Sequence, residues 1–322
     1  MRKALITGGA GFIGSTLADR LSGAGIEVVI YDNLSRGRRE FIDGALERGV
    51  ELVGGDVLDG DRLRRALVGC DTVFHLAANA DVRHGFDRPT IDLEQNTVAT
   101  SVVLEAMRVA GVRRIAFSST GSVYGEPEVF PTPETCPFPI QTSLYGASKL
   151  AGEALIQAYA HGYGFTGIIF RFVSILGERY THGHVFDFLR SLRDDPSRLR
   201  VLGNGRQEKS YLYVGDCVSA MTRATDRELE RGAVHVYNLG TDESIVVDDS
   251  IATITERLGV SPELEYTGGV RGWLGDSPLI RLDCARIRAL GWEPTLSIAD
   301  GIRRTVDWLQ QNPWALEDRV AT

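Results

Sequence analysis

The chain has 322 residues, of which 43% are hydrophobic, enough for a nucleotide-binding domain of about 200 residues and a smaller partner domain. Its net charge of −8 and pI near 5.4 exclude the basic surface that a nucleic-acid or membrane-surface protein needs, so we expect neither partner. The four cysteines, Cys70, Cys136, Cys217 and Cys284, lack zinc spacing, so we expect reduced thiols and no metal site.

Short apolar strands alternate with amphipathic helices along the first half of the chain, which is typical of a parallel sheet covered on both faces. We predict strands at Lys3–Thr7, Glu27–Tyr31, Glu51–Val53, Thr72–Leu76, Arg113–Ser118 and Gly167–Phe170. We predict helices at Phe12–Gly23, Asp61–Val68 and Asp92–Val109, and another that begins near Ser143. After Arg171 the alternation loosens, which indicates a second region.

The first strand begins at the third residue of the chain, and no apolar run is long enough to span a bilayer. We therefore expect no signal peptide, no membrane partner and a cytoplasmic protein.

A glycine-rich turn directly follows the first predicted strand. Gly8 permits a positive φ, Gly11 lets the backbone approach a pyrophosphate, and Gly14 lets the new helix pack against the strand. The helix N-terminus adds amides and a positive dipole, so the turn predicts a dinucleotide site. Such a motif is weak alone, and its strand–turn–helix context strengthens it.

The second predicted strand ends in Asp32, whose carboxylate would accept hydrogen bonds from ribose hydroxyls and repel a 2′-phosphate. This favours NAD over NADP. Arg36, Arg38 and Arg39 follow, and we interpret them as an exposed basic turn. Asp56 and Val57, after the third strand, are placed to touch adenine, although a plain loop acid is an equally good interpretation of Asp56.

Tyr145 and Lys149 lie four residues apart on a predicted helix, so they share one face. An ammonium beside a phenol favours the ionised phenol, which would bring the pKa of Tyr145 from about 10 toward neutrality and make it a general base. The same spacing occurs by chance on exposed helices. Here a strand ending in Ser118-Ser119-Thr120 precedes the pair, and Thr120 offers a hydroxyl that orients the substrate oxygen and relays its proton.

Several segments together resemble the extended short-chain dehydrogenase/reductase family, in its branch of nucleotide-sugar epimerases and dehydratases. They are Thr7–Gly14, Asp32–Ser35, His75–Ala78, Ser118–Thr120, Val123–Gly125, Tyr145–Lys149 and Tyr211–Asp216. The resemblance covers nearly the whole chain. It implies a Rossmann-type doubly wound parallel sheet over residues 1–171, with returning segments at about 210–240. It also implies a smaller C-terminal α/β domain, mainly 172–322, which binds a nucleoside-diphosphate sugar, and a homodimer formed through the helices at 92–109 and 143–159.

The resemblance further implies that NAD is held by Gly8, Gly11, Phe12, Ile13, Gly14, Asp32, Asn33, Ser35, Asp56, Val57, Leu76, Ala77, Ala78, Asn96, Ser118, Tyr145 and Lys149. The catalytic residues are then Thr120, Tyr145 and Lys149. The sugar nucleotide is expected at Thr120, Ser122, Tyr145, Ser174, His184, Val185, Leu202, Lys209, Tyr211, Arg271 and Asp276.

Two residues separate the members of this branch. Dehydratases resemble Thr-Asp-Glu where this chain has Thr120-Gly121-Ser122, and UDP-glucuronate decarboxylases also tend to have Glu at the third position. Elimination needs an acid and a base beyond the Tyr/Thr pair, so Gly121 and Ser122 argue against a dehydratase. The chain is instead similar to UDP-glucose 4-epimerases, in which the C4 alcohol is oxidised to a ketone and reduced again from the other face. We therefore expect a UDP-hexose substrate.

The substrate half departs from the family pattern at several positions. Ser174 replaces an amide, and Lys209 replaces an arginine, which keeps the charge but loses the bidentate fork. Arg271 lies two residues further than usual from Gly275-Asp276, and we expect it to meet phosphate. His182 and His184 are interpreted as polar loop residues rather than metal ligands, because no third ligand is evident.

Two other functions stay open at this point. One is a different NAD-dependent nucleotide-sugar reaction: decarboxylation, 4,6-dehydration or 4-ketoreduction. The other is a non-catalytic NAD-sensing protein, which the presence of Thr120, Tyr145 and Lys149 disfavours because a binding module has no need of a proton relay.

Overall fold

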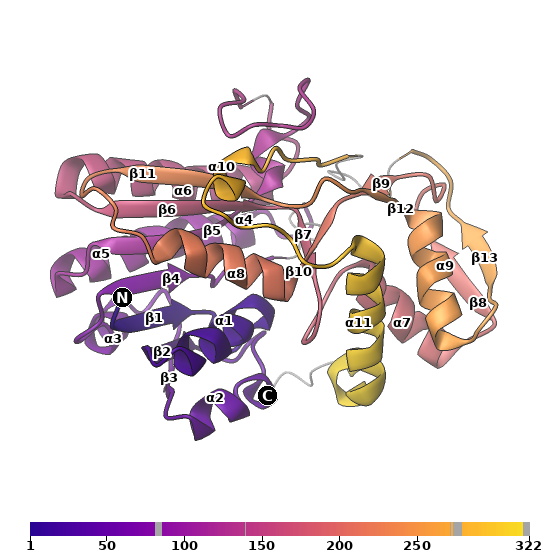
Figure 1. Ribbon diagram of the computed structural model, residues 1–322, viewed down its shortest axis with the longest axis horizontal. Helices are drawn as coiled ribbons and strands as arrows, with labels where there is room; N and C mark the ends of the chain where they lie inside the picture. Colours follow the sequence, from indigo (N-terminus) through magenta and orange to yellow (C-terminus); the bar gives the residue numbers. More distant parts are fainter. Residues whose placement is uncertain (81–85, 139, 271, 273–278, 318–322) are drawn as a thin grey trace.

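The computed structural model of the chain describes residues 1–80, 86–138, 140–270, 272 and 279–317. At its centre is a 7-stranded sheet in the order β11-β6-β5-β4-β1-β2-β3, with every neighbouring pair parallel (Figure 1). The strands are β1 (Lys3–Thr7), β2 (Glu27–Asp32), β3 (Glu51–Gly54), β4 (Thr72–His75), β5 (Arg114–Thr120), β6 (Thr166–Phe172) and β11 (Val234–Leu239). The Rossmann-type fold expected from the sequence is confirmed.

Helices cover both faces of this sheet (Figure 1). They are α1 (Phe12–Gly23), α2 (Asp43–Glu47), α3 (Gly60–Ala66), α4 (Pro89–Asp92), α5 (Ala99–Ala110), α6 (Leu144–Tyr163) and α8 (Val214–Thr225). The predicted strands and helices of the first half are all present, with their ends shifted by a few residues. The sequence patterns did not predict α2 or the edge strand β11.

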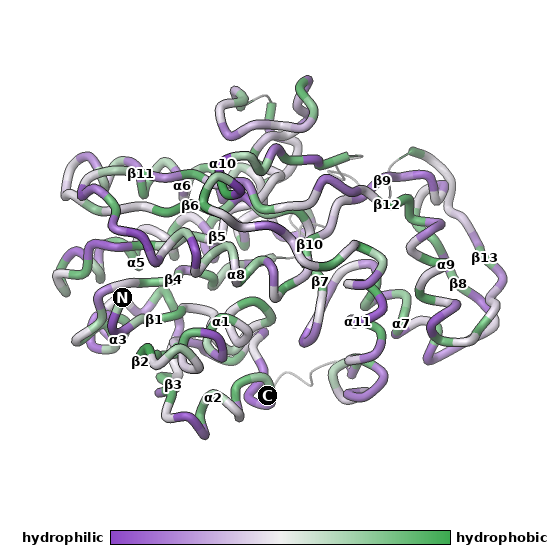
Figure 2. Tube along the Cα trace, in the orientation of Figure 1, coloured by the Kyte–Doolittle hydropathy of each residue, from purple (hydrophilic) through white to green (hydrophobic). Residues whose placement is uncertain are grey.

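Alternating side chains of the strands divide the core into two clusters. Ala4 and Ile6 of β1 belong to the cluster beneath α1 and α8, whereas Leu5 belongs to the one beneath α3, α5 and α6. This alternation follows from the two-residue period of a strand. Figure 2 shows hydrophobic residues concentrated along the central strands, which are therefore buried on both faces.

The order of the strands reverses between β1 and β4, because the chain builds outward to β2 and β3 on one side and to β5 and β6 on the other. In such open α/β sheets ligands bind outside the carboxyl ends of the strands at this reversal. Thr7, at the end of β1, and His75, at the end of β4, are register partners there. The fold thus places the candidate site at the edge reached by the glycine turn.

The predicted helix Asp92–Val109 is not one regular α-helix. A π-helical segment, η2 (Leu93–Val98), lies between α4 and α5. Single π-helical turns inside helices often occur at functional sites, because the extra residue reorients the side chains around it. Asn96 lies within this turn and is buried.

The second half of the chain forms a smaller group of elements to the right of the sheet in Figure 1. Its members are β7 (Ser174–Leu176), α7 (His184–Asp194), β8 (Arg198–Val201), β9 (Glu208–Lys209), β10 (Tyr211–Tyr213), β12 (Ile245–Val246), α9 (Val247–Leu258), β13 (Glu263–Tyr266) and α11 (Ile298–Gln311). Short turns of 3-10 helix are η1 (Arg39–Phe41), η3 (Gly121–Tyr124) and η4 (Pro313–Leu316), and α10 (Ala285–Arg288) is a single α-helical turn. Among the described helices, none has the length and hydropathy needed to cross a membrane.

Candidate active site

The glycine turn leaves no room for side chains. Gly8 has a φ of +68°, and a Cβ there would lie 2.8 Å from the backbone nitrogen of Ala77. A Cβ on Gly14 would lie 2.2 Å from the carbonyl oxygen of Gly8, so only glycine lets α1 begin this close to β1. No side chain caps α1 at Gly11. The backbone amides at the start of α1 therefore fit the diphosphate of a dinucleotide.

Asp32 holds this turn in place. Its carboxylate is buried and accepts hydrogen bonds from the backbone nitrogens of Ala10 (2.9 Å) and Leu34 (2.8 Å). The sequence assigned Asp32 to the ribose, and that role stays a prediction. The structure adds a second one, since the carboxylate ties the end of β2 to the glycine turn.

Arg38 differs from the expected exposed basic turn, although Arg36 and Arg39 are exposed as predicted. Its guanidinium donates to the carbonyl oxygens of Trp314 (3.2 Å), Ala315 (3.3 Å) and Glu317 (3.0 Å). It also lies 5.5 Å from the centre of the Trp314 ring. Arg38 thus attaches the C-terminal turn η4 next to the expected ribose site, a contact that no local pattern predicts.

The other expected NAD residues lie at the carboxyl ends of neighbouring strands. Asn33 donates to Asp56 (3.0 Å) and accepts from Ser35 (2.7 Å), which orders the exposed edge expected to meet adenosine, and Val57 is nearly buried. Leu76, Ala77 and Ala78 follow β4 and are half-buried, and Ser118 donates from its hydroxyl to the carbonyl of His75 (3.2 Å). Phe12 and Ile13 open α1.

Asn96 belongs to a buried polar network that the sequence did not reveal. Its side-chain oxygen accepts from the Asn79 backbone nitrogen (2.9 Å), and its side-chain nitrogen donates to the hydroxyl of Ser148 (2.9 Å). Asn79 also donates to Asp92 (2.8 Å). Asn96 is 1% exposed and fixes the segment after β4 against α6, and its contact with NAD stays a prediction.

Thr120 and Tyr145 meet at the end of β5. Thr120 ends the strand and accepts a hydrogen bond from the backbone nitrogen of Ser122 (3.1 Å). Ser143 caps α6 by accepting from Gly146 (3.0 Å), which places Tyr145 in the first turn of the helix. Burial and the Asp92 carboxylate raise the pKa of Tyr145 to about 12, against a lowering by its hydrogen bond with Thr120. The predicted approach of this pKa toward neutrality is therefore not seen.

Lys149 has its own partners on β5. Its amine donates to the carbonyl oxygen of Ser118 (2.8 Å) and lies 4.8 Å from the centre of the Phe117 ring, so it is directed at β5. The side chain is 2% exposed. Burial lowers the pKa of Lys149 to about 7, although the carboxylates of Asp92 and Glu153 act in the opposite direction.

His75 is a further polar residue that the sequence did not single out for a role of its own. Its ring is fully buried, with hydrogen bonds to the hydroxyls of Thr7 (2.8 Å) and Thr100 (3.1 Å). Burial and the nearby Lys149 charge lower the pKa of His75 to about 3, so the ring is neutral. It joins β1, β4 and α5 behind the site.

The sugar-binding residues expected from the sequence divide into two groups. Ser174 is exposed at the start of β7 and is the register partner of Tyr211 in β10. Lys209 lies two residues before Tyr211 and is half-buried. Leu202 is 40% exposed. These positions remain predictions. Arg271 and Asp276 lie outside the described residues.

Two expected substrate residues pack within the protein. Val185 is 0% exposed in the hydrophobic core, on the buried face of α7, and its contact with the substrate stays a prediction. The His184 ring is bonded on both nitrogens, to the hydroxyls of Tyr211 (2.6 Å) and Ser250 (2.6 Å). It connects α7, β10 and α9. Among the described residues, no group of three or more metal-ligating side chains could hold a metal ion.

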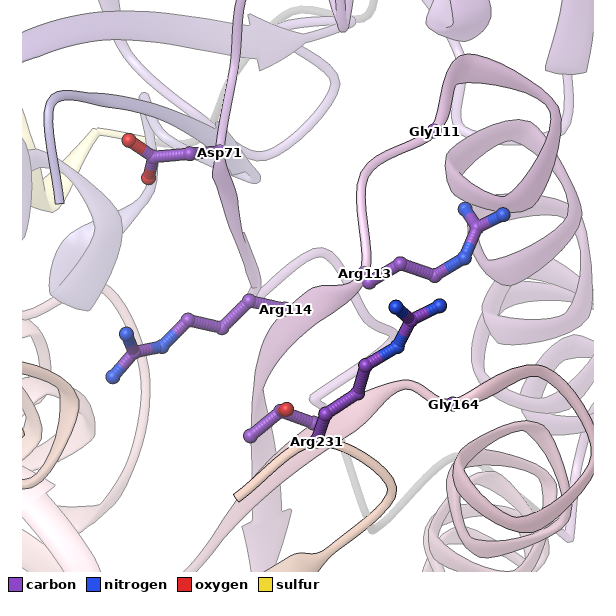
Figure 3. A pocket seen from close by; sticks show the side chains of 7 residues that line it. Asp71, Gly111, Arg113, Arg114, Gly164 and Arg231 are labelled. Carbon is purple, nitrogen blue, oxygen red and sulfur yellow. The ribbon is translucent and has the colours of Figure 1, made fainter. Parts of the chain in front are cut away.

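A surface hollow of about 420 Å³ lies at the opposite edge of the sheet, where β5 and β6 begin (Figure 3). Arg113 donates to the carbonyls of Met107 (3.2 Å) and Arg108 (2.9 Å) at the end of α5, and Arg114 donates to those of Thr225 and Arg227 (2.9 Å) at the end of α8. Figure 3 shows the Arg114 guanidinium directed away from those of Arg113 and Arg231. Arg113 and Arg114 therefore interact with the carbonyl ends of α5 and α8. These contacts explain the positions of both side chains without a bound ligand.

Comparison with known proteins gives consistent matches. A model of the NAD dependent epimerase/dehydratase family matches residues 4–240. The UDP-glucose 4-epimerase of Mycolicibacterium smegmatis is 35% identical over 321 residues, covering 96% of this chain and 98% of that protein. The UDP-glucose 4-epimerase of Streptomyces lividans is 31% identical over 342 residues, covering 98% of this chain and 99% of that protein.

Solved structures show the same likeness. The UDP-glucose 4-epimerase of Thermotoga maritima with UDP-glucose superimposes with a TM-score of 0.86 at 31% identity, covering 97% of this chain and 99% of that one. The UDP-glucose 4-epimerase of Thermus thermophilus in complex with NAD gives a TM-score of 0.84 at 34% identity, covering 96% of this chain and 99% of that one.

Proposed function

Because the chain belongs to the NAD dependent epimerase/dehydratase family, we propose that it is a nucleotide-sugar 4-epimerase that interconverts UDP-glucose and UDP-galactose. Relatives of 31% and 35% identity over nearly the whole chain are UDP-glucose 4-epimerases. The observation that carries the proposal is the meeting of Tyr145 and Thr120 at the end of β5, with Lys149 one helical turn away and the glycine turn at the same sheet edge.

NAD is the cofactor. The glycine turn and the open N-terminus of α1 fit its diphosphate, and Asp32 at the end of β2 fits its adenosine ribose. When bound, NAD supplies a positively charged ring that accepts hydride from C4 of the sugar and returns it to the opposite face.

The residues of the chain handle the proton. As the phenolate, Tyr145 takes the proton of the C4 hydroxyl during oxidation and becomes a phenol; the phenol returns the proton to the keto oxygen during reduction, with Thr120 orienting that oxygen. A phenol with a pKa of about 12 is a suitable donor for the return step. The Tyr145 phenolate that removes the proton is stabilised by positive charge nearby, and Lys149 on the next turn of α6 supplies part of that charge.

The structure supports epimerisation over 4,6-dehydration. A Cβ on Gly121 would lie 2.7 Å from the Cγ2 atom of Ile280 and 3.2 Å from the carbonyl oxygen of Phe172. An aspartate, the residue typical of dehydratases at this position, does not fit without displacing this packing. Ser122 at the next position has a hydroxyl hydrogen-bonded to Thr120 (3.2 Å) and no carboxylate.

The division of labour between the two halves is part of this proposal. Residues 1–171, with the segment at about 210–240, would bind NAD, and residues 172–322 would mainly bind the sugar nucleotide. Two observations support it: β11 and α8 join the central sheet, and β7 pairs with β10 beside the expected sugar residues. All four cysteines are free thiols, which supports the proposed cytoplasmic location.

A homodimer through α5 and α6 is also proposed. Apolar side chains lie exposed on or next to these helices: Leu93 (54%), Val98 (42%), Val109 (54%) and Tyr163 (51%). Contiguous exposed apolar patches mark protein–protein interfaces, and the proposed dimer would bury these four side chains together. Sedimentation at micromolar concentration should give twice the monomer mass, and Val98→Glu should shift it toward monomer; a wild-type monomer would contradict the proposal.

Proton NMR of the purified protein with UDP-glucose, without added NAD, tests the activity. The expected result is the appearance of UDP-galactose, and the reverse reaction from UDP-galactose. If neither inverts, even with NAD added, the 4-epimerase proposal fails for these substrates. Accumulation of a 4-keto sugar or consumption of NAD(P)H would instead indicate one of the other nucleotide-sugar reactions.

A further inference from the structure

Glu153 shares the helix face of two proposed catalytic residues. It follows Lys149 by one turn of α6 and Tyr145 by two, so the three side chains form one row. The Glu153 side chain is 0% exposed. A buried carboxylate in such a row needs partners of its own, because an unpaired buried charge is strongly unfavourable.

Those partners come from two strands. Arg171 of β6 donates to the Glu153 carboxylate through Nε (3.0 Å) and Nη2 (2.6 Å), a bidentate pair. Ser119 of β5 donates to the same carboxylate from its hydroxyl. Ser119 directly precedes Thr120. The Glu153 carboxylate therefore joins α6 to the strand end that presents the proposed catalytic hydroxyl.

Arg171 is itself immobilised. Its Nη1 donates to the hydroxyl of Tyr124 (2.8 Å) and to the carbonyl of Glu134 (3.3 Å). The guanidinium lies 4.8 Å from the ring centre of Tyr124 and 4.9 Å from that of Phe138. Since its position is set by β6, η3 and the following loop, the Arg171–Glu153 pair is a fixed anchor rather than a mobile ion pair.

Lys149 is the charged neighbour of this anchor. It has no ion pair among the described salt bridges, and its amine is held by the Ser118 carbonyl. The titratable groups around it are Asp92 from α4, His75 from β4, and Tyr145 and Glu153 from α6. Asp92 and Glu153 supply the negative charge, and His75 is neutral.

We propose that Glu153 is a positioning residue of the active site: anchored by Arg171, its carboxylate fixes the Ser119–Thr120 strand end against α6 and helps keep Lys149 protonated. The role of Glu153 in catalysis rests on the proposed function. Its effect on the protonation of Lys149 does not depend on which reaction the protein catalyses. Without the Glu153 charge, Lys149 would keep only the Asp92 carboxylate to offset its burial, and Arg171 and Ser119 would lose their charged acceptor.

The titration midpoint of Lys149 can be measured directly, because the chain has three lysines, Lys3, Lys149 and Lys209. The full-length protein, labelled with ¹³C at lysine Cε, should give three resonances, and Lys149→Met assigns the one of interest. We expect Glu153→Gln to move the titration midpoint of Lys149 down by about one pH unit or more. Ser119→Ala, which leaves both charges in place, is the matched control and should move it much less.

Turnover supplies the second readout. Glu153→Gln should lower kcat by about 10-fold or more with a small change in KM, and the alkaline loss of kcat should begin at lower pH. Glu153→Asp, which keeps the charge, should restore the Lys149 midpoint at least in part. It also serves as the second variant if Glu153→Gln does not fold.

A purely structural Glu153 would behave differently. If Glu153→Gln lowers the melting temperature but leaves the Lys149 midpoint and the pH profile of kcat in place, the proposal is overturned. The titration needs no substrate. A wild-type protein inactive on UDP-sugars would therefore refute the 4-epimerase function, while the Lys149 midpoint would still decide the electrostatic role of Glu153.

Discussion

The amine of Lys149 donates a hydrogen bond to the backbone carbonyl of Ser118 over 2.8 Å, which ties the first half of α6 to the end of β5. Burial and the Asp92 carboxylate raise the pKa of the neighbouring Tyr145 phenol to about 12. Tyr145 and Lys149 are thus both held at the end of β5, by Thr120 and Ser118 respectively.

Tyr145→Phe should reduce turnover by about 10²–10⁴-fold, since it removes the group that exchanges the C4 proton and leaves the ring in place. NAD affinity, measured by calorimetry, should change little. Tyr163→Phe, at an exposed position late in α6, is the matched control and should keep full turnover. Unchanged turnover in Tyr145→Phe would remove this residue from the mechanism.

Lys149→Met should also abolish most turnover, because a methionine keeps the apolar stem but neither donates to Ser118 nor carries charge. In this variant no ammonium remains to lower the pKa of Tyr145. The pH profile of kcat tests this: the alkaline loss of kcat that we attribute to deprotonation of Lys149 should be absent. If the same alkaline loss remains, another group is responsible for it.

Gly14→Ala should prevent NAD binding and lower stability, since the new Cβ would lie 2.2 Å from the carbonyl oxygen of Gly8. Gly23→Ala, at the other end of the same helix, has nothing within 4 Å of the new Cβ and should add about 0.5–1 kcal/mol. Calorimetric NAD titration and chemical unfolding of both variants test the contrast. Normal NAD affinity in Gly14→Ala would contradict the described turn.

His75 should make the protein less stable in acid. Its folded pKa of about 3 lies below the ordinary histidine pKa of about 6.5, so below pH 6.5 the unfolded chain binds a proton that the folded protein does not. Stability from this group is therefore complete above pH 6.5 and falls by about 1.4 kcal/mol for each unit toward pH 3.

The test compares unfolding free energies from pH 7 to pH 4.5. His75→Gln should be less stable at pH 7 but should show a flatter decline than the wild type, because the neutral amide does not titrate. His161→Gln, at an exposed position in α6, should keep the wild-type decline. Equal slopes for His75→Gln and the wild type would show that the ring does not cause the acid loss.

Arg38→Met should loosen the C-terminal turn, because three carbonyl groups of residues 314–317 lose their donor. We expect a loss of about 1–3 kcal/mol and faster proteolysis near Asn312. The exposed Arg36→Met is the control. Identical proteolysis of the two variants would contradict the anchoring role of Arg38.

Local patterns predicted most elements in the first half of the chain, although they missed α2 and the π-helical segment η2. Strand alternation and helical spacing predicted every strand from β1 to β6, since each depends on residues near in sequence. The glycine turn, the Tyr145–Lys149 spacing and the strand end at Thr120 likewise identified the expected cofactor and catalytic residues. These features carry the family resemblance that implies the fold and cofactor, and Gly121 and Ser122 favour an epimerase within that family.

The tertiary structure decided how those residues are held. The Arg171–Glu153 pair, the Arg38 contacts to the C-terminus and the His184 bonds to Tyr211 and Ser250 join segments whose separation in sequence leaves no local pattern. Burial also depends on the packed partner: the sequence alone does not show that Val185 is a core residue, and only packing places it in the core. The sequence by itself thus determined which chemistry the chain carries, whereas its three-dimensional contacts decided the charge balance around Tyr145 and Lys149, because electrostatic energies depend on distances and burial that no single segment encodes.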